Sequence, residues 1–322
     1  MVLTAHERGP VGGYLAATRI NSFRRDGRSV ADAIRAAAAV PELAALELNF
    51  PQHVVALQPG ELRALLAETG LRLTGLNLRF EDPAFANGAF TAPDRAARQH
   101  AIDLARQAVA FAREHNARHV VLWMADDGYD YPFQVDYERL WQDEIDGFRR
   151  VADADPACRV SVEYKPRDPR RFALIRSMGD ALLAVREVGR ANFGVTLDVC
   201  HSFMAGEHPP FVAAQALREG RLFGMHLNDG YGPADDGLIV GSIHRETTLE
   251  LLALLAAHGY DGTIYFDTFP AREDPAAELR ANLAALRDLA AAASRIDWAA
   301  LGDAQTRHDA IAALALAAEA QR

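Results

Sequence analysis

Cysteine and basic residues are scarce in this chain of 322 residues, and each scarcity excludes a class of protein. The only cysteines are Cys158 and Cys200, and both lie in apolar segments typical of strands. Two buried thiols do not make the disulfide framework of a secreted protein, so they favour the cytoplasm. Lys and Arg total 34 against 44 acidic residues, a net charge of −10, which argues against a nucleic-acid partner held through its phosphates.

Long apolar runs and several well-known motifs are also missing. No segment reaches the roughly 18 apolar residues of a membrane span, and Met1 to Gly13 lacks the apolar stretch of a signal peptide. We therefore expect no membrane partner and no processing. The chain has no Walker loop, no Gly-x-Ser-x-Gly elbow, no Cys-x-x-Cys and no His-Glu-x-x-His, so nucleotide hydrolysis, serine esterase chemistry and a zincin site lack support. No phosphate-binding motif follows the last two expected strands, which favours an unphosphorylated substrate.

The chain does contain a regular alternation of short apolar runs and longer segments of helical period, repeated eight times. The expected strands are Leu15–Ile20, Ala44–Asn49, Leu71–Leu78, His119–Met124, Val160–Lys165, Gly194–Val199, Gly224–Asn228 and Thr263–Asp267. The expected helices are Val30–Ala39, Gly60–Thr69, Asp94–His115, Tyr137–Ala154, Phe172–Val188, Phe211–Arg218, Thr247–His258 and Asp274–Ala293.

Eight such units predict a (β/α)8 TIM barrel, and the lack of an early glycine-rich strand–turn–helix motif argues against a dinucleotide-binding fold. No linker or charge block divides the chain. We expect one barrel domain over residues 1–294 and a helical C-terminal extension over residues 295–322.

Charged residues end four successive strands of the expected barrel. The carboxyl ends of barrel strands are where catalytic groups gather, so these side chains are expected to converge. Three carboxylates and an imidazole at one point repel each other unless a divalent cation lies between them. Such a donor set suits Mn²⁺ first, and also Co²⁺, Mg²⁺ or Zn²⁺. The sequence thus predicts a metal site formed by Glu163, Asp198, His226 and Asp267.

A second polar group adjoins this set. His201 follows the sixth strand, and Asp235 and Asp236 lie in the loop after the seventh. They either hold a second cation or leave His201 to orient a substrate. Lys165 lies two residues after Glu163, so both side chains point into the barrel mouth. There Lys165 either offsets negative charge or donates to a substrate oxygen, and we favour the second role.

Three further side chains are candidates for substrate contact. Trp123 ends the fourth strand, and Phe133 lies with Tyr129 and Tyr131 in the loop that follows. Aromatic side chains at this place either cover a sugar ring or pack at the barrel rim. His53 follows the second strand and is placed to reach the mouth.

These motifs resemble those of the metal-dependent sugar isomerases of the xylose isomerase-like barrel superfamily, and the bacterial L-rhamnose isomerases look most similar. The matching segments span Trp123 to Asp267, nearly half of the chain. They are Glu163-Tyr164-Lys165-Pro166, Asp198-Val199-Cys200-His201, His226-Leu227-Asn228, Asp267, and Trp123 with the loop Asp127 to Gln134.

The resemblance implies two metals. A second, mobile metal would be bound by His201 and the acidic loop. Where the family has Asp-x-Asp, this chain has Asp235-Asp236, so either Asp236 substitutes by shifting or the second metal is weak or lost. The first metal would bridge two oxygens of an open-chain sugar and would be held by Glu163, Asp198, His226 and Asp267.

The reaction implied is aldose–ketose isomerisation of an unphosphorylated sugar or deoxysugar, by hydride shift or through an enediol. Lys165, Asp267 and His201 would assist proton movement, and the protein would be a homo-oligomer, a tetramer or dimer. Relatives that act as ketose 3-epimerases or C-glycoside-cleaving subunits usually carry two facing Glu residues, so Asp267 favours the isomerase. A DNA-repair nuclease is disfavoured by the net charge, and a catalytically silent sugar-binding barrel is a further alternative.

Overall fold

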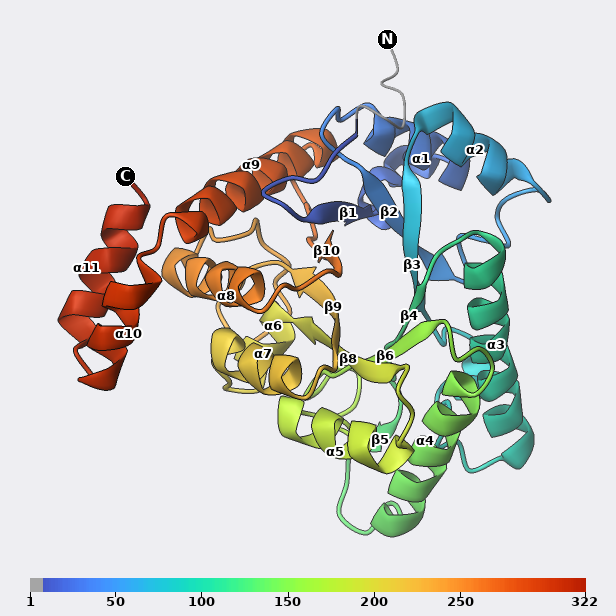
Figure 1. Ribbon diagram of the computed structural model, residues 1–322. Coiled ribbons are helices and arrows are strands. Elements are labelled where there is room, and N and C mark those ends of the chain that lie inside the picture. Colours follow the sequence, from blue (N-terminus) through green and yellow to red (C-terminus); the bar gives the residue numbers. More distant parts are fainter. Residues whose placement is uncertain (1–7) are drawn as a thin grey trace.

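Eight parallel strands close into a barrel in the computed structural model, which describes residues 8–322 (Figure 1). The strand order around the barrel follows the chain, and β10 pairs with β1 to close the ring. This confirms the predicted (β/α)8 TIM barrel. The barrel strands are β1 (Leu15–Arg19), β2 (Ala45–Phe50), β3 (Arg72–Leu78), β4 (His119–Leu122), β6 (Arg159–Glu163), β8 (Phe193–Asp198), β9 (Leu222–Leu227) and β10 (Thr263–Phe266).

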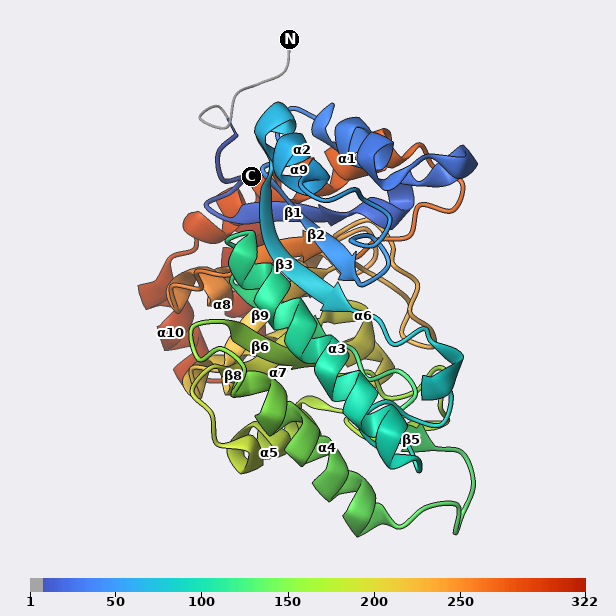
Figure 2. The same cartoon turned by 90° about the vertical axis from the view of Figure 1, so that its right-hand side faces the viewer.

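Helices surround this ring, as Figures 1 and 2 show from two directions. Several begin at an aspartate whose carboxylate accepts a backbone hydrogen bond from the first turn, as Asp94, Asp136 and Asp274 do. The helices are α1 (Val30–Ala38), α2 (Glu61–Thr69), α3 (Arg95–Glu114), α4 (Tyr137–Ala152), α5 (Met178–Val188), α6 (Val199–Met204), α7 (Pro209–Arg218), α8 (Arg245–Ala257), α9 (Pro275–Ser294), α10 (Trp298–Thr306) and α11 (Ala310–Ala320).

The barrel strands lie within two residues of their predicted boundaries, but two connections differ from expectation. The helix predicted over Phe172–Val188 begins only at Met178, because Phe172–Ala173 forms a short strand, β7. Strand β7 pairs antiparallel with β5 (Gly128–Tyr129), so the loops after β4 and β6 are joined in a small ribbon. A further short helix, α6, directly follows β8.

The main hydrophobic core lies between the outer face of the barrel and the helices. Val162, Leu197 and Met225 point outward from their strands and are fully buried in this layer. Leu252 and Leu286 cover them from the helices. Burial of such side chains contributes about 25 cal/mol for each Å² of apolar surface, so this layer holds the ring together.

The inside of the barrel has a different composition. Bulky branched residues fill most barrels of this type, but the apolar group here is small and consists of Ala17, Ala45 and Tyr265 with Leu15 packed against it. Strand register places mainly polar side chains and glycines on the remaining inner positions, with Val121 as an apolar exception. They include Glu47, Asn77, His119, Ser161, Thr196, Gly75, Gly194 and Gly224.

These inner polar groups hydrogen-bond to one another. His119 Nε2 lies 2.7 Å from Ser161 Oγ, which in turn lies 2.6 Å from Thr196 Oγ1. The Glu47 carboxylate accepts hydrogen bonds from Thr74 at 3.2 Å and Asn77 at 3.1 Å. Burial raises the pKa of Glu47. A column of polar side chains, hydrogen-bonded in two groups, therefore lies inside the barrel.

Helices α10 and α11 follow the barrel and pack against each other beside α9 (Figure 1). Two apolar side chains of α11 are open to solvent, Ile311 at 84% and Leu314 at 63% exposure. Within residues 8–322, no helix combines the length and apolar character needed to cross a bilayer.

Candidate metal centre

Four side chains from adjacent strands meet at the carboxyl end of the barrel. Each offers one ligand atom, and these atoms all lie within 4.8 Å of one another. All four side chains are buried, with at most 5% exposure. The structure thus brings together the set named from the sequence, Glu163, Asp198, His226 and Asp267.

Two donor atoms in this set have no hydrogen-bond partner within the described part of the chain. His226 Nδ1 lies 3.4 Å from Glu163 Oε1 and 3.9 Å from Asp267 Oδ2, without the alignment of a hydrogen bond. Asp267 Oδ1 is likewise unbonded, although Arg19 Nη1 lies 3.1 Å away. Atoms that share one ion at about 2.1 Å lie roughly 3 to 4 Å apart, so the spacing suits a divalent cation.

The charges of the set also favour a cation. Burial, and then the carboxylates of Asp235, Glu163 and Asp267, raise the pKa of Asp198 to about 7. Burial alone would lower the pKa of His226, but Glu163 and Asp267 outweigh it and raise the pKa to about 9. The cluster therefore takes up protons that a divalent cation would displace on binding.

A buried amide orients the ligands. Asn228 Nδ2 donates to Asp198 Oδ2 at 3.0 Å and to the Asp267 carbonyl at 3.1 Å. Its Oδ1 accepts the backbone N–H of Cys200, and the N–H of His201 donates to Asp198 Oδ1. Sequence reasoning gave Asn228 no role, although its position two residues after His226, on the same strand face, was the available signal.

His201 adjoins the first set through Nδ1 and contacts the acidic loop through Nε2. Nε2 lies 3.2 Å from Asp235 Oδ2, and Nδ1 lies 3.4 Å from Glu163 Oε1 without a hydrogen bond. If Asp235 accepts the Nε2 proton, the neutral ring keeps its Nδ1 lone pair for a cation. Burial would lower the pKa of His201, but Asp198, Asp235 and Glu163 outweigh it and raise the pKa to about 9.

The acidic loop contributes one carboxylate of its pair to the site. Asp235 Oδ2 also accepts a hydrogen bond from Lys165 Nζ at 3.0 Å, and with Asp198 and Cys200 it forms a second group of potential ligand atoms. Asp236 turns away and accepts the backbone N–H of Tyr231 at 2.7 Å within its own loop. The structure therefore does not bring Asp236 to the site, and its adjacent position in the sequence was misleading.

A cavity of about 220 Å³ opens above the ligands. Trp123 lines it as predicted, with the Arg79 guanidinium 4.5 Å above its ring and Lys165 Nζ 5.5 Å away. Arg19 lies 4.5 Å over the Phe269 ring on another side. Sequence reasoning missed both arginines, because it weighted acids and histidines, although both share the inward register of the ligands.

Two predicted contact residues do not line this cavity. Phe133 is fully exposed, at 100%, because the β5–β7 ribbon directs its loop outward. His53 is buried below the loop, and its Nδ1 accepts the backbone N–H of Asn49 at 3.0 Å. Burial and nearby arginines lower the pKa of His53 to about 4, so it is neutral at neutral pH.

Comparisons with known proteins agree with this architecture. Residues 34–289 match the family model described as a xylose isomerase-like TIM barrel. This chain belongs to the xylose isomerase-like TIM barrel family. A xylose isomerase from Thermus thermophilus is 30% identical over 216 residues, which cover 65% of this chain and 56% of that protein. The chain therefore spans little more than half the length of this relative.

Solved structures of the same fold lie at lower identity. A 3-keto-D-glucoside 4-epimerase from E. coli has a TM-score of 0.67 at 17% identity, covering 85% of this chain and 99% of that chain. A D-allulose 3-epimerase from Methylomonas has a TM-score of 0.64 at 20% identity, with 88% and 95% covered. An AP endonuclease of family 2 from Brucella melitensis has a TM-score of 0.65 at 18% identity, with 83% and 96% covered. The TM-scores of these structures support the family fold.

Proposed function

We propose that this family member is a divalent-metal-dependent isomerase that interconverts an unphosphorylated aldose or deoxysugar and its ketose. The observation that carries the proposal is the buried group of three carboxylates and one imidazole, with His226 Nδ1 and Asp267 Oδ1 unbonded within residues 8–322. Mn²⁺ is the cation we expect, with Co²⁺, Mg²⁺ or Zn²⁺ as alternatives. Glu163, Asp198, His226 and Asp267 would hold it.

The chemistry requires charge stabilisation at two neighbouring oxygens. A bound divalent cation would stabilise the negative charge that develops there as the carbonyl moves between C1 and C2. Lys165 would donate a hydrogen bond to a substrate oxygen, because its Nζ lines the cavity beside Trp123. Asp235 holds both Lys165 and His201 in place by accepting from each.

Groups that face the cavity would move the proton between the two substrate oxygens. Asp267 and His201 line it and lie beside the ligand set. The Trp123 ring would cover the apolar side of the sugar. The motif resemblance to the L-rhamnose isomerases extends the proposal to deoxysugars.

A panel assay tests this function. The purified chain, stripped with a chelator, is incubated with unphosphorylated aldoses and ketoses, with and without Mn²⁺ or Co²⁺, and the sugars are separated by chromatography. We expect metal-dependent interconversion of an aldose and its ketose. Change at C3 of ketoses alone would assign a 3-epimerase instead. Stoichiometric metal binding with no turnover of any sugar would favour a C-glycoside-cleaving subunit or a silent binding barrel.

We also propose that the protein works in the cytoplasm as a homo-oligomer, a dimer or tetramer. Both cysteines are free and buried, in keeping with a reducing compartment. The exposed Ile311 and Leu314 of α11 support a contact through residues 295–322, since apolar helix faces are usually covered. Light scattering of the full chain tests this, and a monomer at all concentrations would contradict it.

A further inference from the structure

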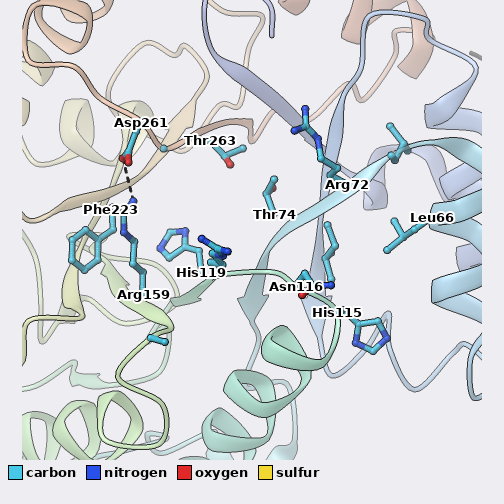
Figure 3. A pocket seen from close by; sticks show the side chains of 15 residues that line it. Leu66, Arg72, Thr74, His115, Asn116, His119, Arg159, Phe223, Asp261 and Thr263 are labelled. Carbon is cyan, nitrogen blue, oxygen red and sulfur yellow. Dashed lines mark hydrogen bonds and ion pairs between the residues drawn. The ribbon is translucent and has the colours of Figure 1, made fainter. Parts of the chain in front are cut away.

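A larger cavity lies at the opposite, amino-terminal end of the barrel. Its volume is about 650 Å³, against about 220 Å³ for the cavity above the ligands. Figure 3 shows Arg72 on one side and Arg159 with Asp261 on the other, with Thr74 and His119 between them. Cavities of 300 to 1,000 Å³ are the usual size for small organic ligands.

The charge of this cavity is opposite to that of the protein. Arg72, Arg118 and Arg159 line it from the starts of β3, β4 and β6, which are neighbours in the barrel. The only carboxylate among its lining residues is Asp261. The lining thus carries a net charge of about two positive units, while the whole chain carries −10. Such a basic hollow concentrates small anions.

Two of the three guanidinium groups have no ion-pair partner among residues 8–322. Arg159 Nη1 lies 3.2 Å from Asp261 Oδ1 and stacks over the Phe223 ring. Arg72 and Arg118 have no carboxylate within 4 Å among residues 8–322. Both residues are exposed, so solvent screens their charges and both guanidinium groups are accessible to an incoming anion.

The rest of the wall offers apolar and polar contacts. Leu66 and Leu73 give apolar contacts on the side of Arg72, and Phe223 gives one on the side of Arg159 (Figure 3). Thr74 and His119 give a polar floor between them. That floor is the lower end of the polar column inside the barrel, because Thr74 bonds Glu47 and His119 bonds Ser161. A small anion alone would fill little of the cavity volume and would leave the apolar side chains without a contact.

We propose that this cavity binds a small phosphorylated organic molecule. A phosphate ester carries a charge of about −1.5 to −2 near neutral pH, which matches the excess positive charge of the lining. Planar guanidinium groups pair with phosphate oxygens in a two-pronged geometry, and Arg72 and Arg118 are free for this contact among the described residues. The organic part contacts Leu66 and Leu73 beside Arg72. The site is separate from the metal centre and does not depend on the isomerase proposal.

Calorimetric titration of the full chain with D-fructose 6-phosphate, inorganic phosphate and D-fructose tests the site. We expect saturable binding of one fructose 6-phosphate, at least about tenfold weaker binding of inorganic phosphate, and no fructose binding that depends on Arg72 or Arg118. Arg72→Gln and Arg118→Gln should each weaken binding by about tenfold or more. Asp261→Asn should strengthen it, because it removes the opposing carboxylate.

Arg280→Gln is the matched control. Arg280 is exposed on α9 and does not line the cavity, so this variant makes the same change in net charge and should bind as the parent chain does. Circular dichroism checks that each variant is folded. If inorganic phosphate bound as tightly as fructose 6-phosphate, the proposed organic part of the ligand would be wrong and the ligand would be free phosphate. No saturable binding at about 10 mM, or binding that survives the Arg72→Gln/Arg118→Gln double variant, would overturn the site.

Discussion

The two ends of this barrel carry opposite chemistry. At the carboxyl end, carboxylates and imidazoles converge around a cavity of about 220 Å³, and some of their buried atoms lack partners within residues 8–322. At the amino end, the cavity is about three times larger, and its lining is basic, with three arginines and one carboxylate. The comparison teaches that convergence of unbonded donor atoms, and not cavity size, marks the candidate metal centre.

A column of polar side chains lies between the two ends of the barrel. Glu47, Ser161 and Thr196 lie between His119 at the amino end and the ligands at the carboxyl end. Gly224 leaves room for Thr196 and His119 on the inner face. Polar side chains therefore fill the interior between the two ends, and substitutions can test each level separately.

The largest effect should come from Asp198→Asn. The variant removes a charged ligand at the carboxyl end, so we expect metal affinity and metal-dependent turnover to fall by more than about 100-fold, since loss of a group that only orients a ligand already costs roughly 10- to 100-fold. The fold should persist, because the hydrophobic layer outside the barrel is untouched. Titration with Mn²⁺ and the sugar assay measure both effects.

Asp236→Asn is the control for this variant. Its carboxylate bonds the Tyr231 N–H and does not face the ligands, so Mn²⁺ affinity should stay within about twofold of the parent. Retained metal-dependent activity in Asp198→Asn would remove Asp198 from the ligand set.

A smaller loss is expected for Asn228→Ala. The variant keeps every ligand but removes the amide that orients Asp198, and loss of such a group typically weakens metal binding by about 10- to 100-fold. The Mn²⁺ titration measures this. Unchanged affinity would mean that the backbone N–H of His201 alone is sufficient to hold Asp198.

Gly224→Ala tests the crowded column between the two ends. An added Cβ would meet His119 Cε1 at 2.7 Å and would also contact Thr196, so we expect a loss of about 1–3 kcal/mol in the free energy of unfolding. Denaturant titration measures it. Gly302→Ala is the matched control in α10, where nothing lies within 4 Å of the new Cβ, and it should be neutral or slightly stabilising. Equal stability of the two variants would show that the interior tolerates extra volume.

The smallest effect concerns acid stability at the amino end. Burial lowers the pKa of His119 from 6.5 to about 3, so the unfolded chain binds a proton there that the folded chain does not. Stability from this group is therefore complete above pH 6.5 and is lost as the pH falls, by about 1.4 kcal/mol per pH unit.

His119→Gln removes this contribution. In denaturant titrations of metal-free protein, the variant should lose less stability than the parent when the pH is lowered from about 7 to about 5. Other groups titrate equally in both proteins, so the difference isolates His119. Identical pH slopes would contradict the assigned burial.

Much of the barrel could be predicted from the sequence because strands and helices alternate with different hydrophobic periods. The four strand-end ligands followed from the same pattern, since carboxyl ends of barrel strands meet. The β5–β7 ribbon could not be predicted, because it joins two-residue segments whose pairing arises only after the loops meet in space.

The sequence also could not show which of two adjacent acids faces the site. Asp235 and Asp236 differ by one position, and the conformation of their loop, with Gly237 at a φ of 57°, decides which carboxylate faces His201. Arg19 and Arg79 were predictable in principle from their inward register. They were overlooked because a positive side chain is not a metal ligand.

The ribbon of β5 and β7 has a mechanical consequence. It ties the loop after β4 to the loop after β6, and the ion pair between Arg170 and Asp130 adds a second tie between the same loops. Trp123 and Lys165 lie where these two loops begin. The two ties therefore help to fix the distance of 5.5 Å between Lys165 Nζ and the centre of the Trp123 ring. We therefore expect adjustment to the shape of an incoming molecule at the opposite rim of the cavity, where Arg19 lies over the Phe269 ring.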